Sequence, residues 1–165
     1  MRFKDILIGS FVLSLVAGLT YVWMTPAGTQ RSPDIALTTV DDQNLRLASF
    51  SGRPLLVTFW ATTCDTCIKE MPELVALHQE LSPRGLAIIG IAMDYDPIDQ
   101  IRQLLTQRHL PYLVTHDRDG SAAQAFGGIR GTPTSFIISP DGRIVQQITG
   151  EMNMNEVRQQ LRVML

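Results

Sequence analysis

The fold is decided by Phe59-Trp60-Ala61-Thr62-Thr63-Cys64-Asp65-Thr66-Cys67-Ile68-Lys69-Glu70-Met71-Pro72. This stretch holds both cysteines of the chain, spaced Cys-x-x-Cys, between an apolar run at 55–60 and an amphipathic helical pattern. The pattern predicts a strand that leads into a helix starting at the cysteine pair. Unpaired N–H groups and the dipole at a helix start stabilise a thiolate on Cys64, and Cys67 lies one turn further, within disulfide range. The stretch therefore predicts reversible thiol–disulfide exchange.

Two other uses of the cysteine pair have to be weighed. An inert structural disulfide usually closes a much longer loop than Cys-x-x-Cys does. A structural zinc site usually needs four ligands, but there is no second cysteine pair, and His78, His109 and His116 lack paired ligand spacing. Redox chemistry is the interpretation that these spacings favour.

Length and composition suit one globular domain behind a leader. The chain has 165 residues and a formal net charge of -2. Its basic residues are scattered and form no run, so nothing in the sequence favours binding to nucleic acid.

The N-terminus has the properties of a membrane anchor. Residues 6–24 carry no charge, and as a helix they would span about 28 Å, close to the hydrocarbon thickness of a bilayer. Arg2 and Lys4 precede this run, which predicts a cytoplasmic N-terminus and an extracytoplasmic domain. A cleaved signal peptide is the alternative, although the 25–27 segment is a poor cleavage site. We assign 1–24 to an anchor or signal segment, 25–33 to a linker and 34–165 to the folded domain.

The rest of the pattern alternates strands and helices. Asp96 followed by Pro97 predicts the N-cap and first residue of one helix, and Asn153 with Glu156 predicts a capping box before the last. Strand–helix alternation followed by a hairpin and a final helix predicts an α/β fold, a mixed central sheet with helices on both faces. The expected strands are 35–37, 45–47, 55–60, 86–92, 112–115, 134–138 and 144–148, and the expected helices are 67–82, 97–105, 121–126 and one from 154.

These residues resemble a known family. The Phe59-Trp60-Ala61-x-x-Cys64-x-x-Cys67 motif, with Pro72 and a distant Gly131-Thr132-Pro133-Thr134 before a strand, resembles the thioredoxin fold. An N-terminal β-hairpin extension, an inserted helix–strand segment at 96–115 and one transmembrane helix in front resemble its TlpA/ResA branch. Members of that branch are membrane-anchored thiol–disulfide oxidoreductases of bacteria that often support cytochrome c maturation. The resemblance covers about 33–165.

The resemblance implies roles for individual residues. Cys64 would be the attacking thiol and Cys67 the buried resolving thiol, with Pro133 as a cis-proline against the disulfide. Glu70 matches the carboxylate that tunes thiol acidity, although a solvated helix residue is the alternative interpretation. The substrate-contacting residues would be Trp60, Thr63 and Thr132, where Trp60 also fits a purely core role.

Three positions depart from the family pattern. Thr58 occupies the place where thioredoxins carry a buried aspartate, so the usual proton acceptor is missing and Glu70 gains interest. Thr63 and Thr66 stand where the family commonly has Trp and Pro. These changes bear on partner choice and redox potential more than on the fold.

The implied function is reduction of protein disulfides in the periplasm by a single-pass inner-membrane protein, with electrons from an upstream membrane donor and without a cofactor or metal. Three arguments bear on whether the protein reduces or oxidises its partners, and they do not all agree. Asp65 places a negative charge beside Cys64, which opposes the thiolate and makes the couple more reducing. Thr66 in place of proline argues for a more oxidising couple, whereas anchored members with the inserted segment are mostly reductants.

Two other functions are considered. A peroxiredoxin-like peroxide reductase would need Pro-x-x-x-Thr-x-x-Cys, but Val57 and Ala61 stand at the Pro and Thr positions. A thioredoxin-like copper-delivery protein normally has a wider cysteine spacing and a partner histidine. His116 is the candidate for that histidine, and an ordinary surface histidine is the interpretation that we favour.

Overall fold

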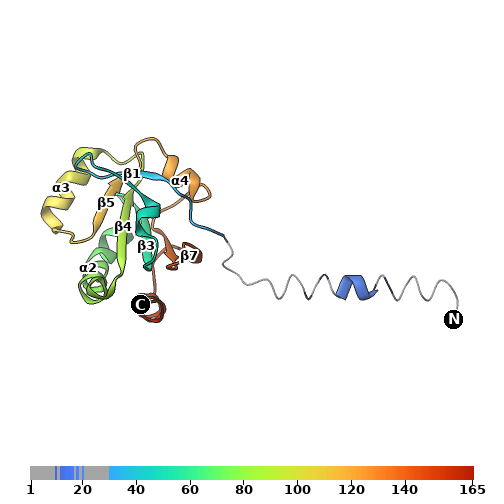
Figure 1. Ribbon diagram of the computed structural model, residues 1–165. Coiled ribbons are helices and arrows are strands. Elements are labelled where there is room, and N and C mark those ends of the chain that lie inside the picture. Colours follow the sequence, from blue (N-terminus) through green and yellow to red (C-terminus); the bar gives the residue numbers. More distant parts are fainter. Residues whose placement is uncertain (1–9, 11, 17, 19, 21–29) are drawn as a thin grey trace, which may run out of the picture.

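The structure is a computed structural model that describes residues 10, 12–16, 18, 20 and 30–165 (Figure 1). Most of the expected anchor at 1–24 and most of the expected linker lie outside the described residues. Within the described part of the chain, no helix combines the length and the apolar character needed to cross a membrane. The end of the expected linker contacts the domain, because Arg31 bridges Arg143 and Ser32 donates a backbone hydrogen bond to Gly142.

A mixed sheet forms the centre of the domain at 30–165. Its strands are β3 (Leu55–Trp60), β4 (Ala87–Ala92), β5 (Leu113–His116), β6 (Thr134–Ile138) and β7 (Ile144–Thr149), in the order β5-β4-β3-β6-β7. Strands β3, β4 and β5 are parallel, whereas β6 and β7 pair antiparallel to their neighbours. The mixed α/β sheet predicted from the sequence is confirmed.

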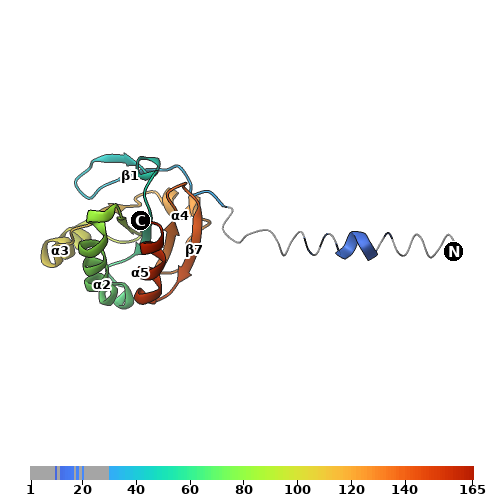
Figure 2. The same ribbon diagram turned by 60° about the horizontal axis from the view of Figure 1, so that its bottom comes forward.

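Strands β3 and β4 are buried along their whole length because both faces of the sheet are covered. Alternate residues of these strands therefore enter two different cores. One core joins Leu56 and Trp60 to α2 (Asp65–Leu81) and α5 (Met154–Val163). The other joins Val57 and Phe59 to α4 (Ser121–Ala125) and the N-terminal hairpin. Figure 2 shows α2 and α5 on one side of the sheet and the hairpin on the other.

The N-terminal hairpin is present as predicted. Strands β1 (Ala36–Thr38) and β2 (Asn44–Arg46) pair antiparallel and lead into the 3-10 helix η1 (Leu47–Phe50). The hairpin is joined to the domain by a bridge between Thr39 and Thr115 and by an ion pair between Asp42 and Arg118.

The remaining helices follow local signals in part. A short 3-10 turn, η2 (Ser82–Arg84), ends the α2 segment. The capping residue Asn153 accepts backbone hydrogen bonds at the start of α5, as predicted. The prediction for α3 (Ile98–Arg108) is wrong at its start, because Pro97 occupies the N-cap and Asp96 makes no capping bond. The Asp96 carboxylate binds Thr62 instead, so a tertiary partner has displaced the local cap.

Candidate active site

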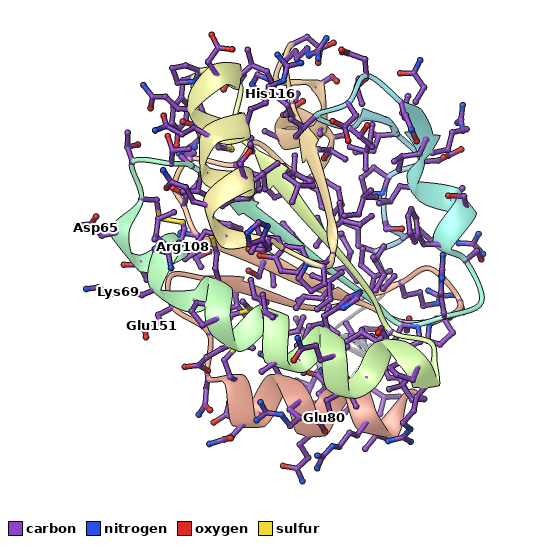
Figure 3. The ribbon with its side chains drawn as sticks, turned by 90° about the vertical axis from the view of Figure 1, so that its left-hand side faces the viewer. Asp65, Lys69, Glu80, Arg108, His116 and Glu151 are labelled. Carbon is purple, nitrogen blue, oxygen red and sulfur yellow. A yellow bond between two sulfur atoms is a disulfide. The ribbon has the colours of Figure 1, made fainter. Side chains whose placement is uncertain are left out.

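Cys64 and Cys67 form a disulfide at the start of α2, with their Cα atoms 5.2 Å apart (Figure 3). Cys64 is the N-cap of the helix, and its Sγ accepts a hydrogen bond of 3.2 Å from the backbone N–H of Cys67. The Cys64 side chain is partly exposed, whereas Cys67 is 3% exposed, as predicted. This amide is one of the donors that can stabilise a thiolate on Cys64 after reduction.

The loop before β6 lies at the end of the sheet where β3 leads into the cysteine loop. In the β3–β6 ladder Phe59 pairs with Thr134, so the next residues along, Trp60 and Pro133, are neighbours at the same end of the sheet. The Thr132–Pro133 bond is cis, as predicted. Thr132 is partly exposed and Pro133 is buried, and the loop is held by a 2.7 Å hydrogen bond from the Thr134 hydroxyl to the Gly131 carbonyl.

Glu70 is buried one helical turn beyond Cys67, at 5% exposure. Its Oε1 accepts a 2.5 Å hydrogen bond from the backbone N–H of Met152, in the loop between β7 and α5. Burial raises the pKa of the Glu70 carboxyl, and the charges of Glu151 and Glu73 raise it further, while the Met152 bond acts in the opposite direction. The predicted burial of Glu70 and the predicted direction of its shift are confirmed.

Trp60 is buried in the core that packs against the cysteine helix. Its indole is 3% exposed, so it offers little surface to a substrate and we assign it to packing. A Cβ on Gly90 would meet Trp60 Nε1 at 3.1 Å and Tyr112 Cε2 at 3.5 Å, which means that both rings pack on the bare glycine backbone. Burial and the nearby Glu70 charge raise the pKa of Tyr112.

Thr58 replaces the buried aspartate of thioredoxins with a neutral polar pair. It is 4% exposed and its hydroxyl accepts a 2.9 Å hydrogen bond from Ser135, which is fully buried. Position 58 of β3 therefore supplies no carboxylate near the site. The buried carboxylate of the cysteine helix α2 is that of Glu70.

The exposed rim of the site carries charges of both signs. Asp65 directly follows Cys64, and Lys69 lies one turn further along α2. Figure 3 shows both residues on the same side of the molecule as Glu151. Thr63, the residue before the pair, is exposed and open to contact by a partner.

His116 takes no part in the disulfide site. It lies at the end of β5, where it pairs with Ala92 of β4, which in turn pairs with Trp60 of β3. Figure 3 shows His116 well apart from Asp65. Among the residues that the structure describes, no group of three or more His, Cys, Asp or Glu side chains could hold a metal ion.

Asp96 was missed as a site residue by the sequence analysis. Its carboxylate is 2% exposed and accepts from both the N–H and the hydroxyl of Thr62, in the loop that leads to Cys64. The two residues are 34 positions apart, and no local signal in the sequence links them.

Comparisons with known proteins agree with this geometry. The Redoxin family model matches residues 26–161. Thiol-disulfide oxidoreductase ResA of Bacillus thuringiensis subsp. konkukian is 31% identical over 134 residues, which cover 81% of this chain and 76% of that protein. ResA of Geobacillus thermodenitrificans is 25% identical over 158 residues, covering 91% of this chain and 90% of that protein.

A solved structure shows the same architecture. The thiol:disulfide interchange protein of the thioredoxin family from Chlorobium tepidum TLS superposes with a TM-score of 0.76 at 26% identity, over 85% of this chain and 99% of that one. With a Cys64–Cys67 disulfide in a thioredoxin fold, the protein is a thiol–disulfide oxidoreductase. The chain belongs to the Redoxin family and, within it, to the TlpA/ResA-like branch.

Proposed function

We propose that this protein is a membrane-anchored, extracytoplasmic enzyme that reduces disulfides of other proteins through Cys64 and Cys67. The observation that carries the proposal is the difference between the two sulfurs. Cys64 is partly exposed at the helix start with an amide directed at its Sγ, whereas Cys67 is buried behind it. An attacking thiol needs access and a stabilised thiolate, and a resolving thiol has to be shielded from external partners.

The reaction proceeds by two exchanges. The Cys64 thiolate attacks one sulfur of the substrate disulfide, forms a mixed disulfide and releases the other substrate sulfur as a thiolate. Cys67 then loses its proton and attacks Cys64 Sγ, which forms the Cys64–Cys67 disulfide and frees the second substrate thiolate. The substrate gains two electrons and, once its thiolates are protonated, two protons. An upstream membrane donor returns two electrons to the protein.

Glu70 is the proposed acceptor for the Cys67 proton. It lies one turn along the same helix, and its raised pKa suits a carboxyl that takes up and releases protons closer to neutral pH. Thr63 and Thr132 are the proposed substrate contacts, because both are accessible, Thr63 directly before the cysteine pair and Thr132 in the loop before β6. Pro133 would support the Thr132 loop against an extended substrate segment.

Anchoring rests on the sequence before Gln30. The uncharged run at 6–24 follows Arg2 and Lys4, the arrangement that places the following domain outside the cytoplasm. The match to ResA of Geobacillus thermodenitrificans covers 91% of this chain. It therefore includes part of the sequence before Gln30, because residues 30–165 make up less than that share of the chain. We place the domain in the periplasm, attached to the bacterial inner membrane, and propose cytochrome c maturation as the first process to test.

Trapping tests the proposed chemistry. A Cys67→Ser variant expressed in cells should hold substrates on Cys64 as mixed disulfides that dithiothreitol releases. The matched control is Cys64→Ser, which should trap none. Equal trapping by both variants, or trapping by Cys64→Ser alone, would contradict the assignment of Cys64 as the attacking thiol.

Enzyme assays separate the alternative functions. Reduction of insulin disulfides should exceed reduction of hydrogen peroxide, and copper titration should show no binding that depends on His116. A faster peroxide reaction would make the protein a peroxide reductase, and copper binding lost in His116→Ala would favour copper delivery. Fractionation of cells that express the full chain should recover the protein with membranes, and recovery in the soluble fraction would contradict an uncleaved anchor.

A further inference from the structure

Two loops meet at the carboxyl ends of the neighbouring parallel strands β3 and β4. The first, 61–64, leads into the cysteine helix, and the second, 93–97, leads into α3. The backbone N–H of Met93 donates to the carbonyl of Trp60 at 3.0 Å, so the loops are already joined where they leave the sheet. Such ends of parallel strands are where α/β proteins assemble their sites.

Asp96 makes the second connection between the loops. Its Oδ2 accepts the backbone N–H of Thr62 at 2.7 Å, and its Oδ1 accepts the Thr62 hydroxyl. The same hydroxyl lies 3.2 Å from Oε1 of Gln100 on α3. Asp96 is 2% exposed, and a buried carboxylate is tolerated only where hydrogen bonds replace water. Both oxygens of Asp96 are therefore committed to one residue of the cysteine loop.

Thr62 is placed so that its position determines that of Cys64. The Cys64 N–H donates to the Ala61 carbonyl at 3.1 Å, which makes 61–64 a tight turn with Thr62 inside it. Fixing the Thr62 backbone therefore fixes the turn, and with it the direction from which the Cys67 amide reaches Cys64 Sγ. Neither Asp96 nor Thr62 touches the sulfur atoms by a hydrogen bond.

We propose that Asp96 and Thr62 are positioning residues that hold Cys64 in the geometry in which the helix-start amide stabilises its thiolate. This inference rests on the proposed role of Cys64 as the attacking thiol. A purely structural role would be visible in the free energy of unfolding, while the reactivity of Cys64 would stay unchanged. The test must therefore read the thiol itself.

Thr62→Val removes the hydroxyl while it keeps the side-chain shape, every charge and the backbone N–H. In the reduced protein we expect the pH profile of Cys64 thiolate formation to move upward by about half a unit, a roughly threefold smaller thiolate population below the midpoint. The profile can be followed by ultraviolet absorbance and by the alkylation rate of Cys64 in a Cys67→Ser background. Thr62→Ser keeps the hydroxyl and should retain the wild-type profile.

The matched control is Thr106→Val. Thr106 on α3 donates its hydroxyl to the Arg102 carbonyl and is exposed, so its loss removes a hydroxyl bond away from the cysteine loop. Thr106→Val should leave the profile unchanged. A shift of equal size in Thr106→Val would overturn the proposal, because the effect would then be general.

A double substitution tests whether the two residues act together. In an Asp96→Ala background, Thr62→Val should produce no further shift, because its partner is already absent. If Asp96→Ala does not fold, Asp96→Asn replaces it in the same cycle. A Thr62→Val profile identical to wild type, or full additivity with the Asp96 substitution, would overturn the proposal. Failure of the wild-type Cys64 to react faster than Cys67 would instead refute the proposed function.

Discussion

The backbone N–H of Met152 donates a 2.5 Å hydrogen bond to Oε1 of Glu70, across 82 positions of the chain. This bond gives the buried carboxyl one partner but leaves it largely without water, and burial raises its pKa. Because Glu70 is one turn from Cys67, the proposed proton transfer from Cys67 would depend on the loop between β7 and α5.

Glu70→Gln should slow the resolving step. The amide can still accept the Met152 bond, but it cannot take the Cys67 proton, so we expect a loss of about a hundredfold or more near neutral pH. Stopped-flow measurement of mixed-disulfide resolution against pH checks this. Glu73→Gln, at an exposed position of the same helix, is the control and should change the rate little. An unchanged pH profile in Glu70→Gln would return Glu70 to a structural role.

Glu70 should make the free energy of unfolding depend on pH. Its folded pKa is raised, so the folded state holds the Glu70 proton more tightly than the unfolded chain, whose value is near 4.5. The contribution of Glu70 to the free energy of unfolding should therefore be largest below that value and fall as pH rises from it through the raised folded pKa. Denaturant titrations of wild type and Glu70→Gln across the acid range should differ by this loss. Parallel curves would contradict the burial of an ionisable carboxyl here.

The cysteine labelling order is a direct consequence of burial. In the reduced protein, an alkylating reagent at neutral pH should modify Cys64 much faster than Cys67, which is 3% exposed. Mass spectrometry of timed samples identifies the labelled cysteine. Equal or reversed rates would contradict the division of roles between the two thiols.

The main elements were predictable because strong local signals agreed with the tertiary structure. The apolar run before Cys64 could only be buried as an inner strand, and the cysteine pair marked the helix start. Asp96 shows the limit of this reasoning. An Asp-Pro pair is a good local N-cap signal, but Thr62 from a neighbouring strand end offered the carboxylate two donors.

Glu70 and Trp60 show what pattern alone leaves open. Charged neighbours on the helix made a solvated Glu70 a reasonable alternative, and its burial is decided by the Met152 loop, far away in sequence. The motif placed Trp60 near the site but did not say whether it faces a partner. Packing of its indole on Gly90 answers this, and no sequence period encodes that contact.

Gly90→Ala should destabilise the domain. The added Cβ would meet Trp60 Nε1 at 3.1 Å, so the indole or the strand has to shift, at a cost of about 1–3 kcal/mol. Thermal or denaturant unfolding measures this. Gly131→Ala is the control, because a Cβ there has no atom within 4 Å. Equal stability of the two variants would contradict the packing described for Trp60.

The buried Thr58–Ser135 pair should behave as a coupled unit. Thr58→Val leaves the fully buried Ser135 hydroxyl without its acceptor and should cost about 1–2 kcal/mol. Adding Ser135→Ala should recover much of that loss, since no polar group is then left unpaired. Additive losses in the double variant, measured by denaturant unfolding, would show that the hydroxyls do not depend on each other.

The reduction potential of the Cys64–Cys67 couple tests the central claim, that the protein is a reductant. Asp65 beside Cys64 disfavours the thiolate and so the reduced form, which lowers the potential, whereas Thr66 in place of proline argues in the opposite direction. The potential is measured by equilibration of the purified domain with glutathione or dithiothreitol buffers. We predict a reduction potential below about −200 mV. A potential near that of the oxidant DsbA, about −120 mV, would contradict the claim and make the protein an oxidant.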